Sequence, residues 1–156
     1  FFVQQVYNKL KEMIIMHKQY KNILVAVDGS EQSYNAVYEA IETAKRNEAK
    51  LTALTVKEVN RYYDEFDMSV VDTSKINAVA ESILCQVDKL NTDGVEIQEK
   101  DMFGDPKKAI LKYAKENEID IIFIGVTGKG MIDKFFIGST TQYVVNHATC
   151  NVMVVR

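Results

Sequence analysis

The chain has 156 residues, of which 47% are hydrophobic and 26% charged, as in an ordinary globular domain. Nineteen Lys and Arg against 22 Asp and Glu give a net charge of −3, which argues against nucleic-acid binding because that needs a concentrated basic surface. Every apolar run is far shorter than the ~20 residues that span a bilayer. We therefore expect no membrane partner and, without a secretory leader, a cytoplasmic protein.

The two cysteines, Cys85 and Cys150, lie far apart and form no CxxC pair. Only His17 and His147 could add imidazole ligands, whereas a structural zinc site needs four clustered ligands. We expect two reduced thiols and no structural metal.

The N-terminal residues 3–14 repeat apolar side chains at helical spacing, which predicts an amphipathic helix of about three turns. The chain begins with Phe, and Met13 and Met16 could each be a natural start. Residues 1–19 are therefore predicted to form an extension, of which the first 15 could be foreign to the natural protein, and residues 20–156 one domain. We expect the helix to pack on that domain or on a neighbouring molecule in a crystal; docking on a partner is the alternative.

From residue 22 onward, buried strands alternate with amphipathic helices. Apolar runs predict strands at 22–28, 51–56, 95–102, 119–125 and 151–155. Apolar stripes at helical spacing predict the helices between them, at about 31–44, 76–87, 106–114 and 139–147. This alternation predicts an α/β fold, an open five-stranded parallel sheet with helices on both faces.

The stretch 57–73 has no clear assignment. Its aromatic residues, Tyr62 and Tyr63 among them, alternate with charged side chains. It is predicted to be either a lid or partner surface, or a solvated connection between strand and helix.

A glycine motif follows the strand predicted at 119–125. Gly125, Gly128, Gly138 and Ser139 form the spacing G-x2-G-x9-G-S, which is neither a Walker A sequence nor G-x-G-x-x-G. Glycines let backbone amides approach an anion, and Ser139 opens a helix whose N-terminus favours phosphate. The residues alone leave two interpretations open, phosphate binding and ordinary turn chemistry.

Ligands of parallel sheets bind beyond the carboxyl ends of the strands, at the point where the strand order reverses. The ends of three predicted strands therefore place Asp28, Val56 and Gly125 near one crevice.

Over about residues 20–156 the sequence resembles the ATP-binding branch of the universal stress protein family. The resemblance rests on the segments 20–30, 104–106, 119–125 and 150–156, together with the glycine motif. It implies a Rossmann-like domain, similar to the adenine nucleotide alpha hydrolases, that binds ATP with magnesium or manganese. It also implies a homodimer formed through the last strand by Val152 and Val154.

The resemblance assigns the ATP site residue by residue. Asp28 would lie beside the nucleotide and could contact magnesium indirectly, while Ala26 and Val56 would line the base and ribose. The first wall of the phosphate loop would be formed by Gly125, Thr127, Gly128, Lys129 and Gly130. The second wall would be formed by Gly138, Ser139, Thr140 and Thr141. Asn151 stands where the family often has proline, and asparagine can still adopt the extended backbone that proline presets. Val126 and Thr127 replace a commoner polar pair, and backbone donors survive this change.

Catalysis is not predicted, because hydrolysis needs groups that position water and stabilise charge on the phosphate. Asp28 and Asp133 are the acids near the loop, and Arg46, Arg61 and Arg156, the only arginines, stand elsewhere. The sequence predicts an ATP-binding stress-response sensor or switch with at most slow hydrolysis, acting on an unknown protein partner. The alternatives are an adenylate-transferring or ATP-hydrolysing enzyme of the same α/β class, and a nucleotide-free dimeric interaction module.

Overall fold

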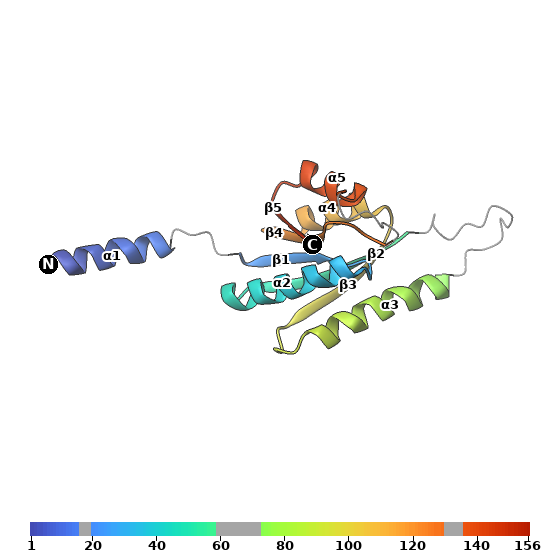
Figure 1. The fold of residues 1–156 in the computed structure, drawn as a ribbon, viewed down its shortest axis with the longest axis horizontal. Helices are drawn as coiled ribbons and strands as arrows, with labels where there is room; N and C mark the ends of the chain where they lie inside the picture. Colours follow the sequence, from blue (N-terminus) through green and yellow to red (C-terminus); the bar gives the residue numbers. More distant parts are fainter. Residues whose placement is uncertain (16–19, 59–72, 130–135) are drawn as a thin grey trace.

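The computed structural model describes residues 1–15, 20–58, 73–129 and 136–156, with side chains described only to residue 10 in the first range. Five parallel strands form one sheet in the order β3-β2-β1-β4-β5 (Figure 1). The strands are β1 (Asn22–Ala26), β2 (Lys50–Lys57), β3 (Ile97–Phe103), β4 (Ile121–Gly125) and β5 (Asn151–Val155). The helices are α1 (Phe2–Ile15), α2 (Glu31–Asn47), α3 (Thr73–Leu90), α4 (Pro106–Glu116) and α5 (Ser139–His147). The predicted fold class is confirmed.

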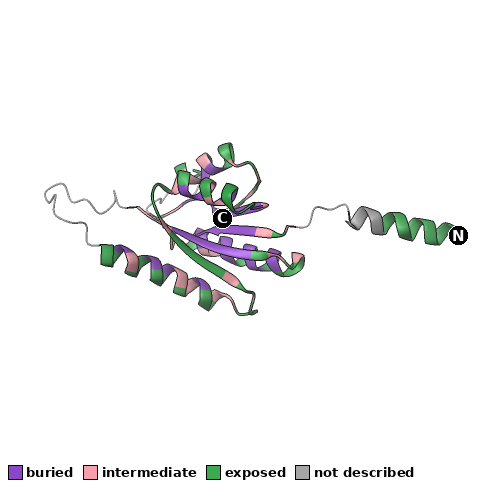
Figure 2. Ribbon diagram, turned by 180° about the vertical axis from the view of Figure 1, so that it is seen from behind, coloured by how far each residue is buried: buried purple, intermediate pink, exposed green. Residues whose placement is uncertain are grey.

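The central strands are apolar along their whole length because helices cover both faces of the sheet. Ile23 and Val25 of β1 are fully buried in a core cluster with α2 and α3. Leu24 and Ala26 point to the opposite face and belong to a second cluster, built with α4 and α5. Figure 2 shows these buried strands between two helical layers.

The strand order reverses between β1 and β4. From β1 the chain adds β2 and then β3 outward, and it returns to place β4 on the other side of β1. The register aligns Ile23 with Ile121 and Ala26 with Ile124, so the two strands end level with each other. The chain then leaves β1 for α2 on one face and β4 for α5 on the other. These diverging connections leave a crevice at this edge of the sheet.

The N-terminal helix is confirmed as α1, but the prediction that it packs on the domain is wrong. The part of its apolar stripe whose side chains are described is exposed, with Val3 at 79%, Tyr7 at 58% and Leu10 at 51%. Figure 2 shows this part of the helix in the colour of exposed residues. The physical reason is that α2, α3, α4 and α5 already cover both faces of the sheet and leave it no apolar face.

No described helix is long and apolar enough to cross a membrane. Most of the stretch 57–73, including Tyr62 and Tyr63, lies outside the described residues.

Candidate functional site

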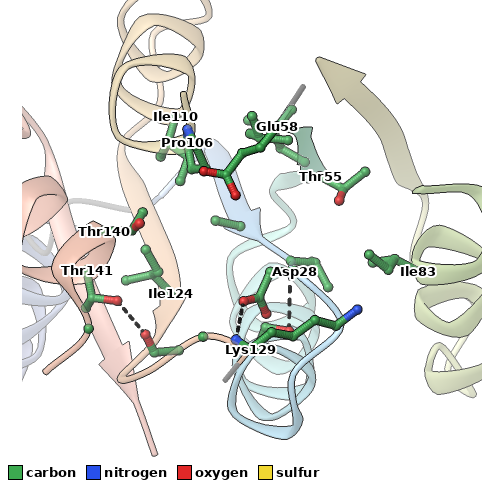
Figure 3. A pocket seen from close by; sticks show the side chains of 18 of the residues that line it. Asp28, Thr55, Glu58, Ile83, Pro106, Ile110, Ile124, Lys129, Thr140 and Thr141 are labelled. Atoms are coloured by element: carbon green, nitrogen blue, oxygen red, sulfur yellow. Dashed lines mark hydrogen bonds between the residues drawn. The ribbon is translucent and has the colours of Figure 1, made fainter. Parts of the chain in front are cut away.

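A cavity of about 260 Å³ lies at the carboxyl ends of β1, β2 and β4 (Figure 3). Its size is near the lower end of small-molecule pockets, which run from about 300 to 1,000 Å³. The sequence-predicted site residues that line it are Ala26, Asp28, Val56, Gly125, Thr127, Gly128, Lys129, Gly138, Ser139, Thr140 and Thr141. Gly130, the remaining predicted residue, lies outside the described part of the chain.

The turn after β1 closes the N-terminus of α2. Gly29 adopts a φ of 83°, which favours glycine, and the chain then enters the helix through Ser30. The Ser30 hydroxyl accepts a hydrogen bond from the Ser33 amide at 3.2 Å. Asp28 Oδ1 in turn accepts hydrogen bonds from the Ser30 amide at 3.0 Å and the Ser30 hydroxyl at 2.6 Å. The first turn of α2 therefore carries its own cap.

Asp28 also connects this turn to the glycine motif. Its Oδ2 accepts a hydrogen bond from the Lys129 amide at 2.9 Å (Figure 3). Burial by itself raises the pKa of Asp28, but the hydrogen bonds from Ser30, Lys129 and Ser33 favour the carboxylate and together hold the pKa below its ordinary value. At neutral pH Asp28 is therefore an ionised brace between the two loops.

Two glycines of the motif are required by the protein's own packing. A Cβ at Gly125 would lie 2.8 Å from the backbone carbon of Gln32, so only glycine lets the end of β4 approach the first turn of α2. A Cβ at Gly128 would lie 2.5 Å from Asp28 Oδ2. These contacts are shorter than packed side chains tolerate, so both positions exclude any other residue without a local shift.

Gly138 differs from these two. A Cβ there would meet the Thr127 Cα at 3.4 Å, an ordinary packing distance, and its own φ of −59° suits any residue. The fold therefore does not require glycine at this position, and what its missing side chain leaves open is the entry to α5.

The N-terminus of α5 has no side-chain cap. Gly138 donates its own amide to the Val126 carbonyl at 2.8 Å, and the Thr141 hydroxyl donates to the Gly125 carbonyl at 2.7 Å (Figure 3). These contacts fix the helix start against the end of β4. The amides of Ser139 and Thr140, in the first turn, have no helical carbonyl to bind, and both residues line the cavity. This geometry favours an anion.

The charged groups of the cavity lining are few. Lys129 holds its ammonium over Gly29, where a Cβ would lie 2.9 Å from Nζ. Lys57 is ion-paired with Asp101 and lies over the Phe103 ring, 3.9 Å from its centroid. The charge of Lys57 is therefore already neutralised by a residue of β3. Among the described residues of the lining, Lys129 is the lysine that remains available at the cavity mouth.

The acids of the lining are Asp28 and Glu58, and Figure 3 shows the Glu58 carboxylate projecting into the cavity. Across the described residues, no three His, Cys, Asp or Glu side chains gather closely enough to hold a metal ion.

The model of the universal stress protein family matches residues 19–156. The chain belongs to this family. A Staphylococcus aureus (strain USA300) protein that carries the universal stress protein name is 39% identical over 142 residues, covering 88% of this chain and 84% of its own. The solved universal stress protein UspA from Lactobacillus plantarum is 36% identical, with a TM-score of 0.77, and the match covers 90% of this chain and 100% of that one.

Two structures of more distant universal stress proteins are nucleotide complexes. One is a complex with cAMP, 24% identical with a TM-score of 0.69, covering 89% of this chain and 99% of that one. The other, from Archaeoglobus fulgidus, is a complex with dAMP, 21% identical with a TM-score of 0.67, covering 89% and 100%. At these identities the likeness to this chain shows the fold.

Sequence reasoning missed most of the apolar wall of the cavity. The missed residues are Val27, Ser33, Leu54, Thr55, Lys57, Glu58, Ile76, Val79, Ala80, Ile83, Pro106, Ile110 and Ile124. The apolar stripe at 76–87 predicted a helix but not a wall of the cavity. No signal in the sequence distinguishes Thr55 from Thr52, the other threonine of β2.

The assembled cavity combines apolar walls with one helix end that favours an anion and one lysine at its mouth. Among the described residues that line it, none is an arginine. Such an arrangement can hold a ligand with an apolar ring and an anionic tail, whereas it offers little to stabilise charge that develops on a transferring phosphate.

Proposed function

We propose that this universal stress protein binds ATP and acts as a nucleotide-dependent sensor or switch in the stress response. The observation that carries the proposal is the open N-terminus of α5. Gly138 leaves the start of α5 without a side-chain cap, and Ser139 and Thr140 line the same cavity as the other described residues of the predicted ATP site. Backbone amides at a helix N-terminus are ready donors for phosphate oxygens.

The family relatives support an adenine nucleotide as the ligand. Two structures of shared fold are complexes with cAMP and with dAMP. Both ligands combine an adenine base with one phosphate group, which matches an apolar cavity beside an anion-favouring helix end. That the ligand of this chain is ATP is our proposal.

Each part of the ATP molecule has counterparts in the cavity lining. Ala26, Val56 and Ile110 supply apolar surface for the nucleoside, and the α5 amides with the glycine loop supply donors for the phosphates. Lys129 can neutralise phosphate charge from the mouth. A magnesium or manganese ion bound to ATP would reduce the repulsion between its phosphates and Asp28. Because both oxygens of Asp28 already accept hydrogen bonds, we expect its contact with that ion to be indirect.

A sensor is a better candidate than an enzyme. The described lining holds no arginine. Asp28, the acid nearest the glycine loop, already accepts hydrogen bonds that connect the two loops, so it is not free to position water. We expect incubation with radiolabelled ATP to leave the nucleotide intact over the time in which binding saturates. Rapid formation of ADP or AMP at the rate of a dedicated enzyme would favour the enzymatic alternative.

Thermal melting tests binding itself, because a ligand of the folded state raises the melting temperature with its concentration. We expect ATP with magnesium to raise the melting temperature of protein first shown to be free of nucleotide, and inorganic sulfate at equal ionic strength to have a much smaller effect. Absence of any ATP effect would sink the proposal and leave the nucleotide-free interaction module.

The proposed homodimer uses β5, which pairs with β4 and lies at one edge of the sheet. Val152 and Val154 are half-buried in the second core cluster, and Met153 between them is 46% exposed. An apolar edge strand can recruit a second copy. Light scattering should give twice the monomer mass, and Met153→Lys should reduce it to the monomer; a monomeric parent would contradict the dimer.

A further inference from the structure

The cavity extends to both faces of the sheet. On β2, Leu51 and Ala53 belong to the core cluster with α2 and α3, and Leu54 belongs to the cluster with α4 and α5. Since side chains alternate along a strand, Thr55 faces α3 and Val56 faces α4. Of the predicted site residues on strands, Ala26 and Val56 lie on the α4 and α5 side, and Gly125 lies against the first turn of α2. The α3 wall of the cavity therefore has no assigned role.

Thr55 is the uncharged polar residue of β2 on this side of the cavity, where Lys57 is the charged one. Its side chain lies between Glu58 and Ile83 at the cavity wall (Figure 3). The residue is only 2% exposed, yet its hydroxyl makes no hydrogen bond with any described residue. Among the described residues, every side-chain oxygen that is completely sealed from the surface has a hydrogen-bond partner. The Thr55 hydroxyl therefore reaches the cavity space, with its donor and acceptor both unused.

The surroundings of this hydroxyl suit a flat ring. Ile76, Ala80 and Ile83 of α3 form an apolar wall beside it. Lys57, the nearest cation on β2, is neutralised by Asp101 and hydrogen-bonded to the Asn77 side chain at 3.0 Å. The Lys129 ammonium lies near Ile83 at the mouth on this side, because a Cβ at Gly29 would be 2.9 Å from Lys129 Nζ and 3.1 Å from Ile83 Cγ1. A base presents apolar faces and a polar edge, which is what an apolar wall with one hydroxyl can accept.

We propose that the Thr55 hydroxyl hydrogen-bonds the polar edge of the base and is a specificity-determining group of the nucleotide site. This inference rests on the nucleotide binding proposed above. It adds the α3 wall to the surface that holds the base, beside Ala26 and Val56, and leaves the α5 end to the phosphates. A polar edge that meets no partner in a buried site is disfavoured, so one hydroxyl can discriminate between bases.

The test uses Thr55→Val, which removes the hydroxyl and keeps the shape. Affinities for ATP, GTP, CTP and UTP are measured by calorimetry for parent and variant. We expect about three- to tenfold weaker binding of the preferred nucleotide, the effect of one hydrogen bond, and a changed ratio among the four bases. Because the hydroxyl bonds nothing in the protein, the melting temperature should stay equal or rise. Thr55→Ser, which keeps the hydroxyl, should retain the parental affinity and base preference.

Thr52→Val is the matched control, because Thr52 is a buried threonine of the same strand that does not line the cavity. It should leave all four affinities unchanged. Equal affinities in the parent and Thr55→Val, or a uniform loss for all four nucleotides, would overturn the assignment of Thr55 to the base. If the parent protein binds no nucleotide, the result overturns the proposed nucleotide binding itself, and with it the role of Thr55.

Discussion

The two helices that start at the cavity, α2 and α5, begin in opposite ways. Ser30 caps α2, and Asp28 holds Ser30 in place through its amide and hydroxyl. α5 begins at Gly138 without any side-chain cap. A helix N-terminus at a sheet edge is therefore not by itself a binding site. At α2 the protein satisfies its own donors, whereas at α5 it leaves them to a ligand or to water.

The largest expected effect is the difference in the free energy of unfolding between alanine substitutions at two glycines of the motif, Gly125 and Gly138. Gly125→Ala places a Cβ against the backbone of α2's first turn and should lower the free energy of unfolding by about 3 kcal/mol, as overpacking does. Gly138→Ala meets only ordinary contacts and should change it by less than about 0.5 kcal/mol. Urea denaturation measures both. Equal losses in the two variants would show that Gly138 also serves packing.

Asp28→Asn should lower the free energy of unfolding by about 2 kcal/mol at neutral pH, because a carboxylate accepts its hydrogen bonds more strongly than an amide. The folded pKa of Asp28 lies below its unfolded value of about 3.9. Its stabilisation is therefore complete above that value and is lost as the pH falls through the folded pKa. Urea denaturation should show a constant difference between parent and variant from about pH 5 to 7 that narrows below about pH 4. A difference that grows on acidification would contradict the brace.

Ser30→Ala opens the closed helix end. Loss of the cap should lower the free energy of unfolding by about 1 kcal/mol. The ATP affinity should change less than about threefold, since α2 is not the phosphate site in this account. Calorimetry and thermal melting on the same sample check both numbers, and a large loss of affinity at unchanged stability would assign phosphate binding to α2.

Gly138→Ser closes the open helix end and has the smallest expected effect on stability. A serine hydroxyl at this position can accept from the second or third amide of α5, which should raise the free energy of unfolding by a few tenths of a kcal/mol, about the difference between serine and glycine caps. The same hydroxyl competes with phosphate, so ATP affinity should fall severalfold. Tighter ATP binding by this variant would argue against the open amides as the phosphate donors.

The sequence predicted the sheet and the loops of the site because both depend on local pattern. The apolar run of β1 encodes a buried strand, and the glycine spacing encodes a close approach of the backbone. The sequence could not separate the roles of the glycines: Gly125 and Gly128 face the protein's own atoms, while Gly138 faces the cavity. It also missed Thr55, because which face of β2 meets α3 depends on tertiary packing.

The most direct test of the central claim is calorimetric titration of nucleotide-free parent and Gly138→Val with ATP and magnesium. A valine at the entry to α5 covers the open amides while the fold tolerates its Cβ, so the melting temperatures should agree. The account predicts saturable binding by the parent and at least about tenfold weaker binding by the variant. No binding by the parent, or equal binding by a folded variant, would contradict it.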